Sequence, residues 1–467
     1  MSCRPIALVS SEPIRPAMAG IGLRYLELAR RLPELAGVPV RLVSPATEEE
    51  TRRALDAGAA QGPEPSPDLE VRTFQRGTLA DTLEGCAGAV AQGQLANDVL
   101  LECPQLPTAI DLYDPWLVEN LHYTEVLGLD PYRNDHATWV LQMSRGDFFL
   151  CSSEEQRTFY LGFLTALGRV NPERVAADPD LAGLVAPVPF GVPGELPSHR
   201  PWLPPRRPQG ERHRLLFGGL YDWYDPWTLL DALERLPPAA TPWTLYFIAN
   251  PNPGSTPQRL LGEVEAECRR RGWWADADAG EGEGDAEGGP RRVELLDWVP
   301  GDRRYDLLRD VDLMVAPHRP SLETRLSLRT RFLDAAAAGC PSVTSEGGAM
   351  SRLLEHHRAG WVVPPADPGA LAAALAEALT DPPAVERRRR GAAELAAAFA
   401  WDEVLAPLAR WCRDPAADPT REDFAFQPGT QAPPDDLWFR ARRFVRRHLS
   451  GLRVEIRSGD DARGGRR

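Results

Sequence analysis

The stretch from residue 320 to residue 343, PSLETRLSLRTRFLDAAAAGCPSV, holds side chains that could bind an anion. Its apolar spacing predicts a helix after a short acidic loop, with Ser327 as the N-cap. Arg329 and Arg331 then lie in the first turn, where a cation opposes the helix dipole and costs a few tenths to about 1 kcal/mol. Because a helix N-terminus already attracts anions, two arginines there indicate a bound anion. The alternative is that Glu323 pairs with one arginine and nothing else binds.

Glycines between the first predicted strand and the next helix form a second candidate site. Gly20 and Gly22 make a G-x-G pattern, which is a weak motif by itself. No third glycine follows, and no acid ends the second strand, which argues against a nicotinamide cofactor. The glycines would still let a ligand approach the backbone closely. The alternative is a tight turn that serves packing alone.

Two clusters combine acidic and aromatic residues at predicted strand ends. One is DLYDP at residues 111–115, and the other is GGLYDWYDP at residues 218–226, which includes Gly218, Gly219 and Asp222. Ligands of open parallel sheets bind beyond the carboxyl ends of the strands. Rings stack on the CH faces of sugars and carboxylates accept hydrogen bonds from hydroxyls, so the clusters favour a sugar ligand. Alternatively, the aromatic residues of the second cluster only pack the wall between two domains.

Two of the eight histidines lie near these candidate sites. His318 ends a predicted strand just before the acidic loop, whereas His136 lies on a predicted helix that precedes a strand. A single histidine is more often packed or exposed than a ligand. The sequence contains no HExxH motif and no pair of CxxC motifs, so we predict no metal site. It also lacks GxSxG, which disfavours a serine hydrolase.

The composition narrows the class of protein further. The net charge is −14, so a general nucleic-acid binder is disfavoured. All 53 basic residues other than histidine are arginines, which excludes Schiff-base lysines and P-loop lysine chemistry. The seven cysteines have no CxxC spacing, as expected for reduced cytosolic thiols. No secretory leader and no long apolar run is present, so we expect a cytoplasmic protein without a membrane-spanning helix.

Buried strand patterns alternate with helical patterns along most of the chain, which predicts parallel sheets covered by helices. We expect an α/β protein with two doubly wound domains. The predicted parts are an N-terminal domain at 1–193, a proline-rich linker at 194–212, a C-terminal domain at 213–414 and a basic tail at 415–467. The acidic segment at 275–289 is predicted to be a disordered surface loop. The predicted strands are 5–10, 38–44, 87–92, 108–111, 148–151, 185–190, 214–218, 245–249, 293–296, 313–316, 342–344 and 361–363.

The tail interleaves arginines with aromatic and aliphatic residues between Leu437 and Arg453, with no acid among them. One interpretation is a basic amphipathic helix on an anionic membrane surface, at the inner membrane face. The other is a helix docked on the acidic body of the same protein.

Several of these stretches resemble the GT-B glycosyltransferases, in particular the large retaining group that uses nucleotide sugars. That group has a P-S-x-x-E loop and an L-E-A-x-A-x-G helix beside the donor, and the matching stretches here are 320–323 and 333–339. The segments at 341–343, 347–348 and 360–367 continue the match. The resemblance implies two Rossmann-like domains that face each other across a cleft, followed here by a C-terminal helical tail.

A narrower resemblance is to bacterial transferases of surface-polysaccharide and lipopolysaccharide biosynthesis. The similar stretches cover roughly residues 1–410, without the tail. They are DLYDPWLVENL at 111–121, GDFFLCSSEEQRTFYLGFLTALGRVNP at 146–172, VPFGVP at 188–193, GGLYDWYDPWTLLDAL at 218–233 and ETRLSLRTRFLD at 323–334.

The resemblance implies a nucleotide-diphosphate sugar as donor substrate, no tightly bound cofactor, and a glycan or lipid-linked acceptor. Two departures stand out: the usual Arg and Lys after the first strand of domain two are absent, and Glu323 and Asp334 are eleven residues apart rather than eight. We therefore expect Arg329 and Arg331 to hold the diphosphate without a metal. The predicted catalytic residues are Glu323, Arg329, Arg331 and His136, and the predicted donor-binding residues are Asp334, Gly20, Gly22, Gly218, Gly219, Asp222, His318, Gly347 and Gly348.

Within this resemblance Asp334 would bind the ribose hydroxyls and Glu323 would lie near the donor sugar, while His136 would contact the sugar or the acceptor. Retention of anomeric configuration is implied by the resemblance alone. Two alternatives remain open. One is a non-catalytic GT-B binding or scaffold protein, and the other is a nucleotide-sugar isomerase.

Overall fold

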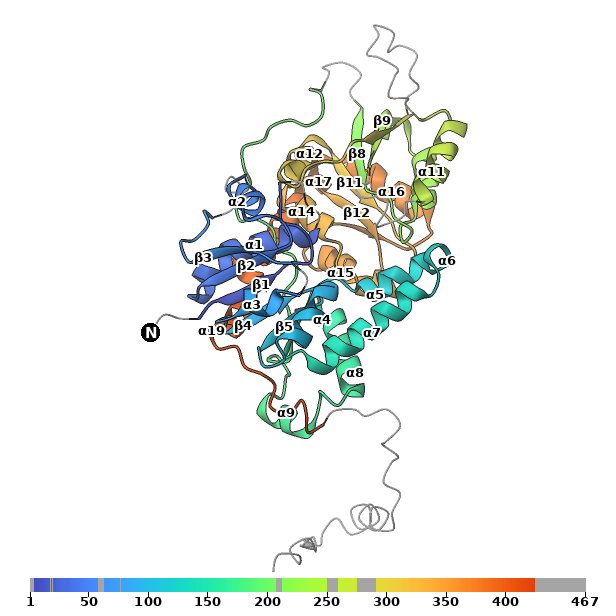
Figure 1. Cartoon of the computed structure of the whole chain (residues 1–467). Coiled ribbons are helices and arrows are strands. Elements are labelled where there is room, and N and C mark those ends of the chain that lie inside the picture. The colour runs from blue at the N-terminus through green and yellow to red at the C-terminus, as the bar shows by residue number, and fades with distance from the viewer. Residues whose placement is uncertain are drawn as a thin grey trace, which may run out of the picture. The chain divides into compact units, whose positions relative to one another are not determined.

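The computed structural model describes residues 4–16, 18, 20–57, 63–75, 77–206, 212–249, 259–274 and 291–424 (Figure 1). The predicted acidic loop at 275–289 and the interleaved arginines of the basic tail lie outside the described residues. Two parallel sheets, each flanked by helices, belong to one compact unit that runs to Phe424. None of the described helices is both long and apolar enough to cross a bilayer.

The first sheet has the strand order β3-β2-β1-β4-β5-β6-β7. Every neighbouring pair is parallel. Its elements are β1 (Ile6–Val9), α1 (Gly20–Ala36), β2 (Val40–Ser44), α2 (Glu48–Ala57), β3 (Leu69–Thr73), α3 (Leu79–Leu83), β4 (Gly88–Ala91), α4 (Gly93–Glu102), β5 (Thr108–Asp111), α5 (Trp116–Glu119), η2 (Asn120–Tyr123), α6 (Thr124–Leu127), α7 (Asp130–Arg145), β6 (Phe148–Cys151), α8 (Glu154–Ala166), α9 (Pro172–Ala177) and β7 (Val185–Pro187).

The second sheet has the order β10-β9-β8-β11-β12-β13 and is also parallel throughout. Its elements are β8 (His213–Gly218), α10 (Pro226–Glu234), η3 (Pro238–Ala240), β9 (Trp243–Ile248), α11 (Arg259–Arg270), β10 (Arg291–Leu296), η4 (Gly301–Arg303), α12 (Arg304–Asp310), β11 (Leu313–Ala316), α13 (Leu322–Leu326), α14 (Thr330–Ala337), β12 (Ser342–Ser345), α15 (Ala349–His356), β13 (Gly360–Val363), α16 (Pro368–Thr380), α17 (Pro382–Ala398), α18 (Trp401–Val404) and α19 (Ala406–Arg413).

Alternating side chains of the first sheet enter two different cores. Ile6 and Leu8 of β1 pack with α1, while Ala7 and Val9 pack with α4 and α7 on the opposite face. Strands buried on both faces give the continuous apolar runs seen in the sequence, because neither face meets water. The predicted fold class, two doubly wound α/β domains, is therefore confirmed.

Each strand predicted from the sequence occurs, but β3 was missed. β3 is the edge strand, and of its residues only Val71 is buried. A single buried position leaves no apolar run for a sequence pattern to detect.

The last helices return to the first sheet. The chain passes from Phe399 to Trp401 beside the linker, where the backbone N–H of Val192 donates to the carbonyl of Phe399 at 2.9 Å. Trp401, Leu405 and Leu408 then pack into the core that includes α1. The predicted domain boundaries stay a prediction, and the structure adds that α18 and α19, placed in the second domain by the sequence, contact the first.

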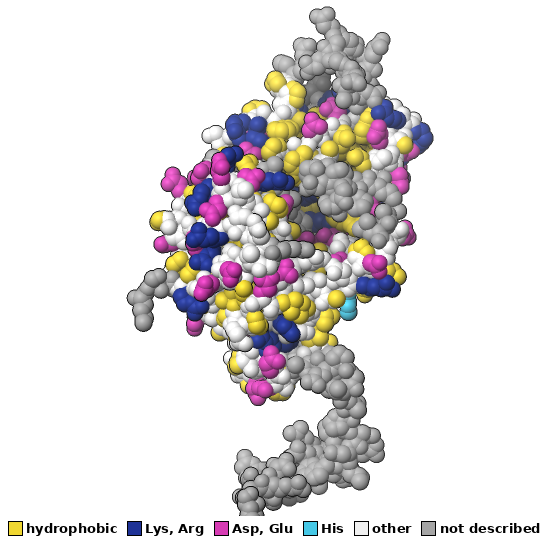
Figure 2. All heavy atoms as spheres, viewed as in Figure 1, with side chains coloured by type: hydrophobic (Ala, Val, Ile, Leu, Met, Phe, Trp, Pro, Cys, Tyr) yellow, Lys and Arg dark blue, Asp and Glu magenta, His cyan; other side chains and the backbone are white. Residues whose placement is uncertain are grey.

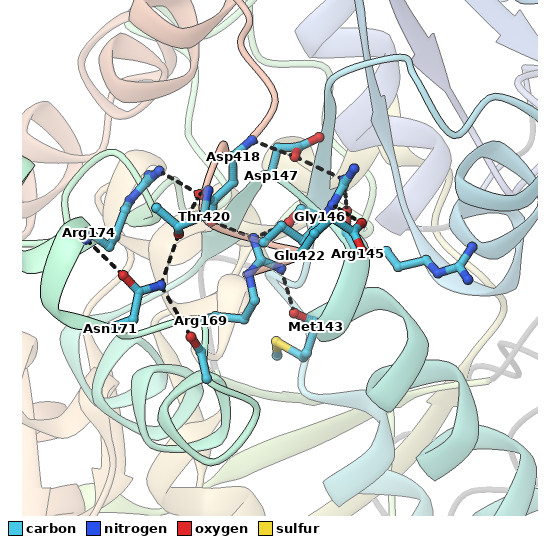
Figure 3. Close-up of polar contacts among 12 residues, drawn as sticks. Met143, Arg145, Gly146, Asp147, Arg169, Asn171, Arg174, Asp418, Thr420 and Glu422 are labelled. Atoms are coloured by element: carbon cyan, nitrogen blue, oxygen red, sulfur yellow. Dashed lines mark hydrogen bonds and ion pairs between the residues drawn. The ribbon is translucent and has the colours of Figure 1, made fainter. Parts of the chain in front are cut away.

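A segment that we call the strap, residues 414–424, continues from α19 along the first domain (Figure 3). Asp418 is 5% exposed and accepts a hydrogen bond from Arg169 Nη2 at 2.9 Å, while its backbone N–H donates to Asp147 Oδ1 at 2.9 Å. Asn171 donates to the Thr420 hydroxyl at 2.9 Å. Without the strap, the buried guanidinium of Arg169 would lose its carboxylate partner, and Asp147 and Asn171 would each lose a hydrogen bond.

Two helical glycines provide a matched test of this packing. A Cβ at Gly391 in α17 would lie 2.1 Å from the carbonyl oxygen of His357, whereas one at Gly162 in α8 would meet nothing within 4 Å. Gly→Ala inside a helix normally stabilises by about 0.5–1 kcal/mol, and overpacking costs about 1–3 kcal/mol. We expect Gly391→Ala to lower the free energy of unfolding and Gly162→Ala to raise it, measured by urea denaturation. Equal effects of the two changes would contradict this packing.

Candidate functional site

The candidate site lies where the carboxyl ends of β5 and β8 approach α13 and α14. The loop after β5 carries Tyr113 and Asp114 from the first domain. Asp111, the last residue of β5, accepts two hydrogen bonds from the buried Arg24. Nε lies 2.7 Å from Oδ2, and Nη2 lies 3.0 Å from Oδ1. This pair fixes the end of β5, because both charges are fully buried and neutralise each other.

The helix starts differ from the sequence prediction. Ser321, rather than Ser327, is an N-cap: its hydroxyl accepts from the backbone N–H of Thr324 at 3.0 Å and starts the short helix α13. Ser327 ends α13, and α14 begins at Thr330 with Arg329 at the N-cap position. The prediction of Ser327 as N-cap was therefore wrong, because the 3.6-residue apolar period continues across two short helices and hides the break between them.

Glu323 and Arg329 form a buried ion pair. Glu323 Oε2 lies 2.5 Å from Arg329 Nη2, and the two side chains are 0% and 6% exposed. The guanidinium of Arg329 also lies over the rings of Tyr224, at 5.1 Å, and Trp223, at 5.7 Å. Glu323 Oε1 and Arg329 Nε have no hydrogen-bond partner among the described residues. The pairing of Glu323 with one arginine, which the sequence left open, is therefore present, and the partner is Arg329.

Arg331 lies at the glycine turn after β8. Its Nη1 donates to the carbonyl oxygen of Gly219 at 3.0 Å. Gly218 has a φ of +87°, and a Cβ there would lie 2.6 Å from Nη1, so the turn requires glycine both for its backbone and for this contact. In the described part of the chain no carboxylate lies within ion-pair distance of Arg331, in contrast to Arg329. Arg331 is therefore the cation that an incoming anion could meet.

Three carboxyl groups converge where α5 meets α13. Burial raises the pKa of Asp114 to about 6, with a further contribution from the charge of Glu323, although a hydrogen bond with Glu119 opposes the rise. Burial and the charges of Asp114 and Glu323 raise the pKa of Glu119 well above its usual range. The hydroxyl of Ser327 donates to Glu119 Oε1 at 3.0 Å, which links the two domains. Sequence reasoning drew attention to Asp114 but missed Glu119, whose position depends on the contact between α5 and α13.

His318 is 4% exposed and stacks on Tyr224, with the ring centroids 5.8 Å apart. Burial lowers the pKa of His318 well below its usual value, and the charges of Arg329 and Arg331 lower it further. The ring is therefore neutral near pH 7 and can accept or donate a hydrogen bond without adding charge.

Asp334 faces another part of the second domain. Its Oδ1 accepts from the hydroxyl of Tyr305 at 2.8 Å and from Arg304 Nε at 3.1 Å. Gly348 caps α15, and a Cβ there would lie 2.5 Å from the carbonyl oxygen of Thr324, so α15 begins directly against α13. Gly347 precedes it with a φ of +111°.

The remaining predicted residues lie at different distances from this cluster. Gly20 and Gly22 begin α1, and a Cβ at Gly20 would lie 3.6 Å from the Tyr113 hydroxyl, which places α1 beside the loop after β5. Asp222 is buried in the loop after β8. His136 is exposed on α7 and faces Tyr132 at 6.0 Å between ring centroids. Among the described residues, His136 has no contact with this cluster.

The described residues include no group of three or more His, Cys, Asp or Glu side chains placed to hold a metal ion. Acidic and basic side chains are interspersed over the face of the molecule in Figure 2.

Residues 222–381 match the protein family described as "Glycosyl transferases group 1". Glycogen synthase of Mycobacterium tuberculosis is 39% identical over 79 residues, which are 17% of this chain and 19% of that protein. The amylovoran biosynthesis glycosyltransferase AmsK of Erwinia amylovora is 30% identical over 84 residues, or 18% of this chain and 21% of that protein. The matches thus span about a fifth of these relatives.

Among solved structures, HepE of Anabaena in complex with UDP-glucose superposes with a TM-score of 0.56 at 15% identity, over 87% of this chain and 98% of that one. This similarity shows the fold. Together with the family match, it confirms that the chain has the GT-B architecture and carries a group 1 glycosyltransferase domain.

The carboxyl cluster generates a pH prediction. The pKa of Asp114 is raised to about 6 in the folded protein, from an ordinary value of 3.8, so the folded protein binds more protons than the unfolded chain between these pH values. The free energy of unfolding therefore falls as the pH rises from about 4 to about 6. We expect Asp114→Asn to remove this contribution, measured by urea denaturation at a series of pH values.

The matched control is Asp130→Asn, because the side chain of Asp130 is 92% exposed at the surface. Its pH curve should run parallel to that of the wild-type protein. A parallel curve for Asp114→Asn would contradict the raised pKa of Asp114.

Proposed function

We propose that this chain, which carries a group 1 glycosyltransferase domain at residues 222–381, transfers a sugar from a nucleotide-diphosphate sugar to a cell-surface glycan or a lipid-linked acceptor. The observation that carries the proposal is the position of Arg331 within this domain. Its guanidinium lies at the glycine turn after β8 and has no carboxylate partner among the described residues. A guanidinium fork at such a turn suits a diphosphate.

The N-terminus of α14 supports the same assignment. Arg331 lies in its first turn, so backbone N–H groups and a guanidinium point toward one region. As the bond between sugar and diphosphate breaks, negative charge builds on the leaving group, and preorganised cations lower the barrier to that step. Arg329 adds positive charge from beside its partner Glu323. In this proposal the arginines balance the diphosphate and no metal is required.

The other donor-side groups take roles that fit their surroundings. Asp334 holds the ribose hydroxyls with Oδ2, because Oδ1 already accepts from Tyr305 and Arg304. Glu323 lies near the donor sugar, with Oε1 buried and without a described partner. The neutral ring of His318 contributes a hydrogen bond, and the backbone of the turns at 218–219 and 347–348 lines the donor. Retention of anomeric configuration is proposed from the family resemblance.

The first domain supplies the acceptor side. Asp114 and Glu119 reach the cluster from the loop and helix after β5, and Gly20 and Gly22 bring α1 close to that loop. His136 is exposed on α7, and its contact with the sugar or the acceptor stays part of the proposal. HepE in complex with UDP-glucose and AmsK, a transferase of amylovoran biosynthesis, support a sugar nucleotide and a polysaccharide product.

The proposed test is a thermal-shift screen against UDP, GDP, TDP, ADP and CMP and their common sugars. A nucleotide that binds only the folded state stabilises it by about 2.7 kcal/mol at a hundred times its dissociation constant. We expect one diphosphate family to raise the melting temperature, and Arg331→Ala to weaken its binding by about 10- to 100-fold, because a charged hydrogen bond contributes about 1.5–3 kcal/mol.

Arg325→Ala is the matched control for Arg331→Ala, since Arg325 is an exposed arginine on the adjacent helix α13. It should bind the nucleotide like the wild-type protein. No shift with any nucleotide at millimolar concentration would favour a non-catalytic scaffold protein instead. Conversion of one sugar nucleotide to another without acceptor would indicate an isomerase.

We further propose that the protein associates with the inner face of the membrane through the arginine-rich sequence between Leu437 and Arg453. Each arginine near an anionic surface contributes about 1 kcal/mol. A chain that ends after Phe424 keeps the whole strap, and we expect it to lose sedimentation with phosphatidylserine vesicles that the full chain retains. Equal sedimentation of both chains would exclude this role of the tail.

A further inference from the structure

Gln156 is a fully buried side chain in the first turn of α8. Its backbone N–H donates to the hydroxyl of Ser153, the N-cap of this helix, at 3.2 Å, and its Oε1 accepts from the backbone N–H of Ser152 at 2.7 Å. The contact of Oε1 with Ser152 fixes the orientation of the side-chain amide, and the NH₂ group is left to meet other acceptors.

The NH₂ group of Gln156 joins two backbone carbonyls from different domains. Nε2 donates to the carbonyl oxygen of Tyr113 at 3.1 Å and to that of Leu326 at 2.9 Å. Tyr113 directly precedes Asp114 in the loop after β5. Leu326 is the last residue of α13, the helix that carries Glu323. One buried amide therefore connects the acidic loop of the first domain to the element that positions the Glu323–Arg329 pair.

The chemistry of the contact requires a donor with two hydrogens. Both partners are carbonyl oxygens, and that of Leu326 lies at a helix C-terminus, where carbonyls lack intrahelical partners. A carboxylate at this position would repel both oxygens. An apolar side chain would leave the carbonyl of Leu326 without this donor, while the carbonyl of Tyr113 would keep the hydroxyl of Ser152. Hydroxyl groups at residue 156 could reach only one of the two.

Two neighbouring contacts cross between the domains at the same place. The hydroxyl of Ser327 donates to Glu119 Oε1 at 3.0 Å, one residue after Leu326. Arg352 of α15 forms an ion pair with Glu155 of α8, in which the two side chains are 52% and 32% exposed. An exposed ion pair contributes little, so the hydrogen bonds of Gln156 and Ser327 are the contacts here that can fix α13, and that of Gln156 reaches the helix itself.

We propose that Gln156 is a positioning residue, through which docking of the first domain holds α13, and with it Glu323 and Arg329, in the geometry needed for sugar transfer. The effect on sugar transfer rests on the proposed function, whereas the mechanical coupling of the two domains does not. It assigns to the acceptor-side domain a part in completing the donor side. Arg331 donates to the turn at 218–219 rather than to α13, so the proposed diphosphate contact of Arg331 is separate from this coupling.

The first experiment measures release of UDP from UDP-glucose by the full-length protein without acceptor. The variants are Gln156→Met, which keeps the size and loses all three side-chain hydrogen bonds, and Gln156→Glu, which adds repulsion. We expect kcat to fall about tenfold or more in Gln156→Met and further in Gln156→Glu, because small misplacements of reacting groups have large effects on rate. KM for UDP-glucose should change by less than about threefold, since Arg331, the proposed diphosphate contact, is untouched.

Gln142→Met is the matched control. Gln142 is equally buried, and its Nε2 donates to the carbonyl oxygen of Gly93 at 2.7 Å and to Asn97 Oδ1 at 3.0 Å, both within the first domain. It should lower the melting temperature about as much as Gln156→Met and leave kcat unchanged. Equal losses of kcat in the two variants would show that Gln156 affects the rate only through general stability, and would overturn the proposal.

The second experiment needs no catalysis. Hydrogen exchange of the backbone amides in residues 322–329 should be faster in Gln156→Met than in the wild-type protein, and unchanged in Gln142→Met. Unchanged exchange in Gln156→Met overturns the coupling whatever the activity. If the wild-type protein released no UDP, and bound no nucleotide in the thermal-shift screen, the proposed function would fail, and exchange alone would decide whether Gln156 couples the domains.

Discussion

The buried ion pair between Glu323 and Arg329 is the interaction on which the charges and the chain path around the candidate site depend. Removing one ion from water costs several kcal/mol, so neither charge could stay here without the other. Burial lowers the pKa of His318, and the charge of Arg329 lowers it further. Burial also raises the pKa of Asp114 and of Glu119, and the charge of Glu323 adds to both shifts. The break between α13 and α14 lies between these two residues and brings them together.

Because the chain has no lysine, its buried side-chain cations are arginines. The planar fork makes this possible, because one guanidinium can satisfy several acceptors in fixed directions. Arg24 binds both oxygens of Asp111 and also donates to the carbonyls of Pro189 and Val188, at 2.9 and 2.7 Å. The same device recurs at Arg169 in the strap contacts. Arginine thus connects strand ends that are far apart in sequence, both at the site and away from it.

Much of this architecture could be predicted from the sequence, because strands buried on both faces leave continuous apolar runs. The failures have a common physical origin. Val71 alone is buried in β3, so the edge strand had no pattern, and the break after α13 was hidden by an apolar period that spans both helices. Glu119 and Gln156 gave no signal, since the contacts of Glu119 with Ser327 and of Gln156 with Leu326 form only when the two domains meet. The role of His136 stays a prediction.

The strap affects the order in which the parts of this protein can fold during synthesis. Ribosomal synthesis releases the first sheet long before residue 418, and domains usually fold as they emerge. Here Arg169 binds the carboxylate of Asp418, and Asp147 accepts a hydrogen bond from its backbone N–H. The buried guanidinium therefore stays without this carboxylate, and Asp147 without this donor, until almost all of the described chain has left the ribosome. The N-terminal domain should therefore be among the last parts to reach its final form in the cell, and a nascent chain stalled before the strap would carry an unfinished first domain.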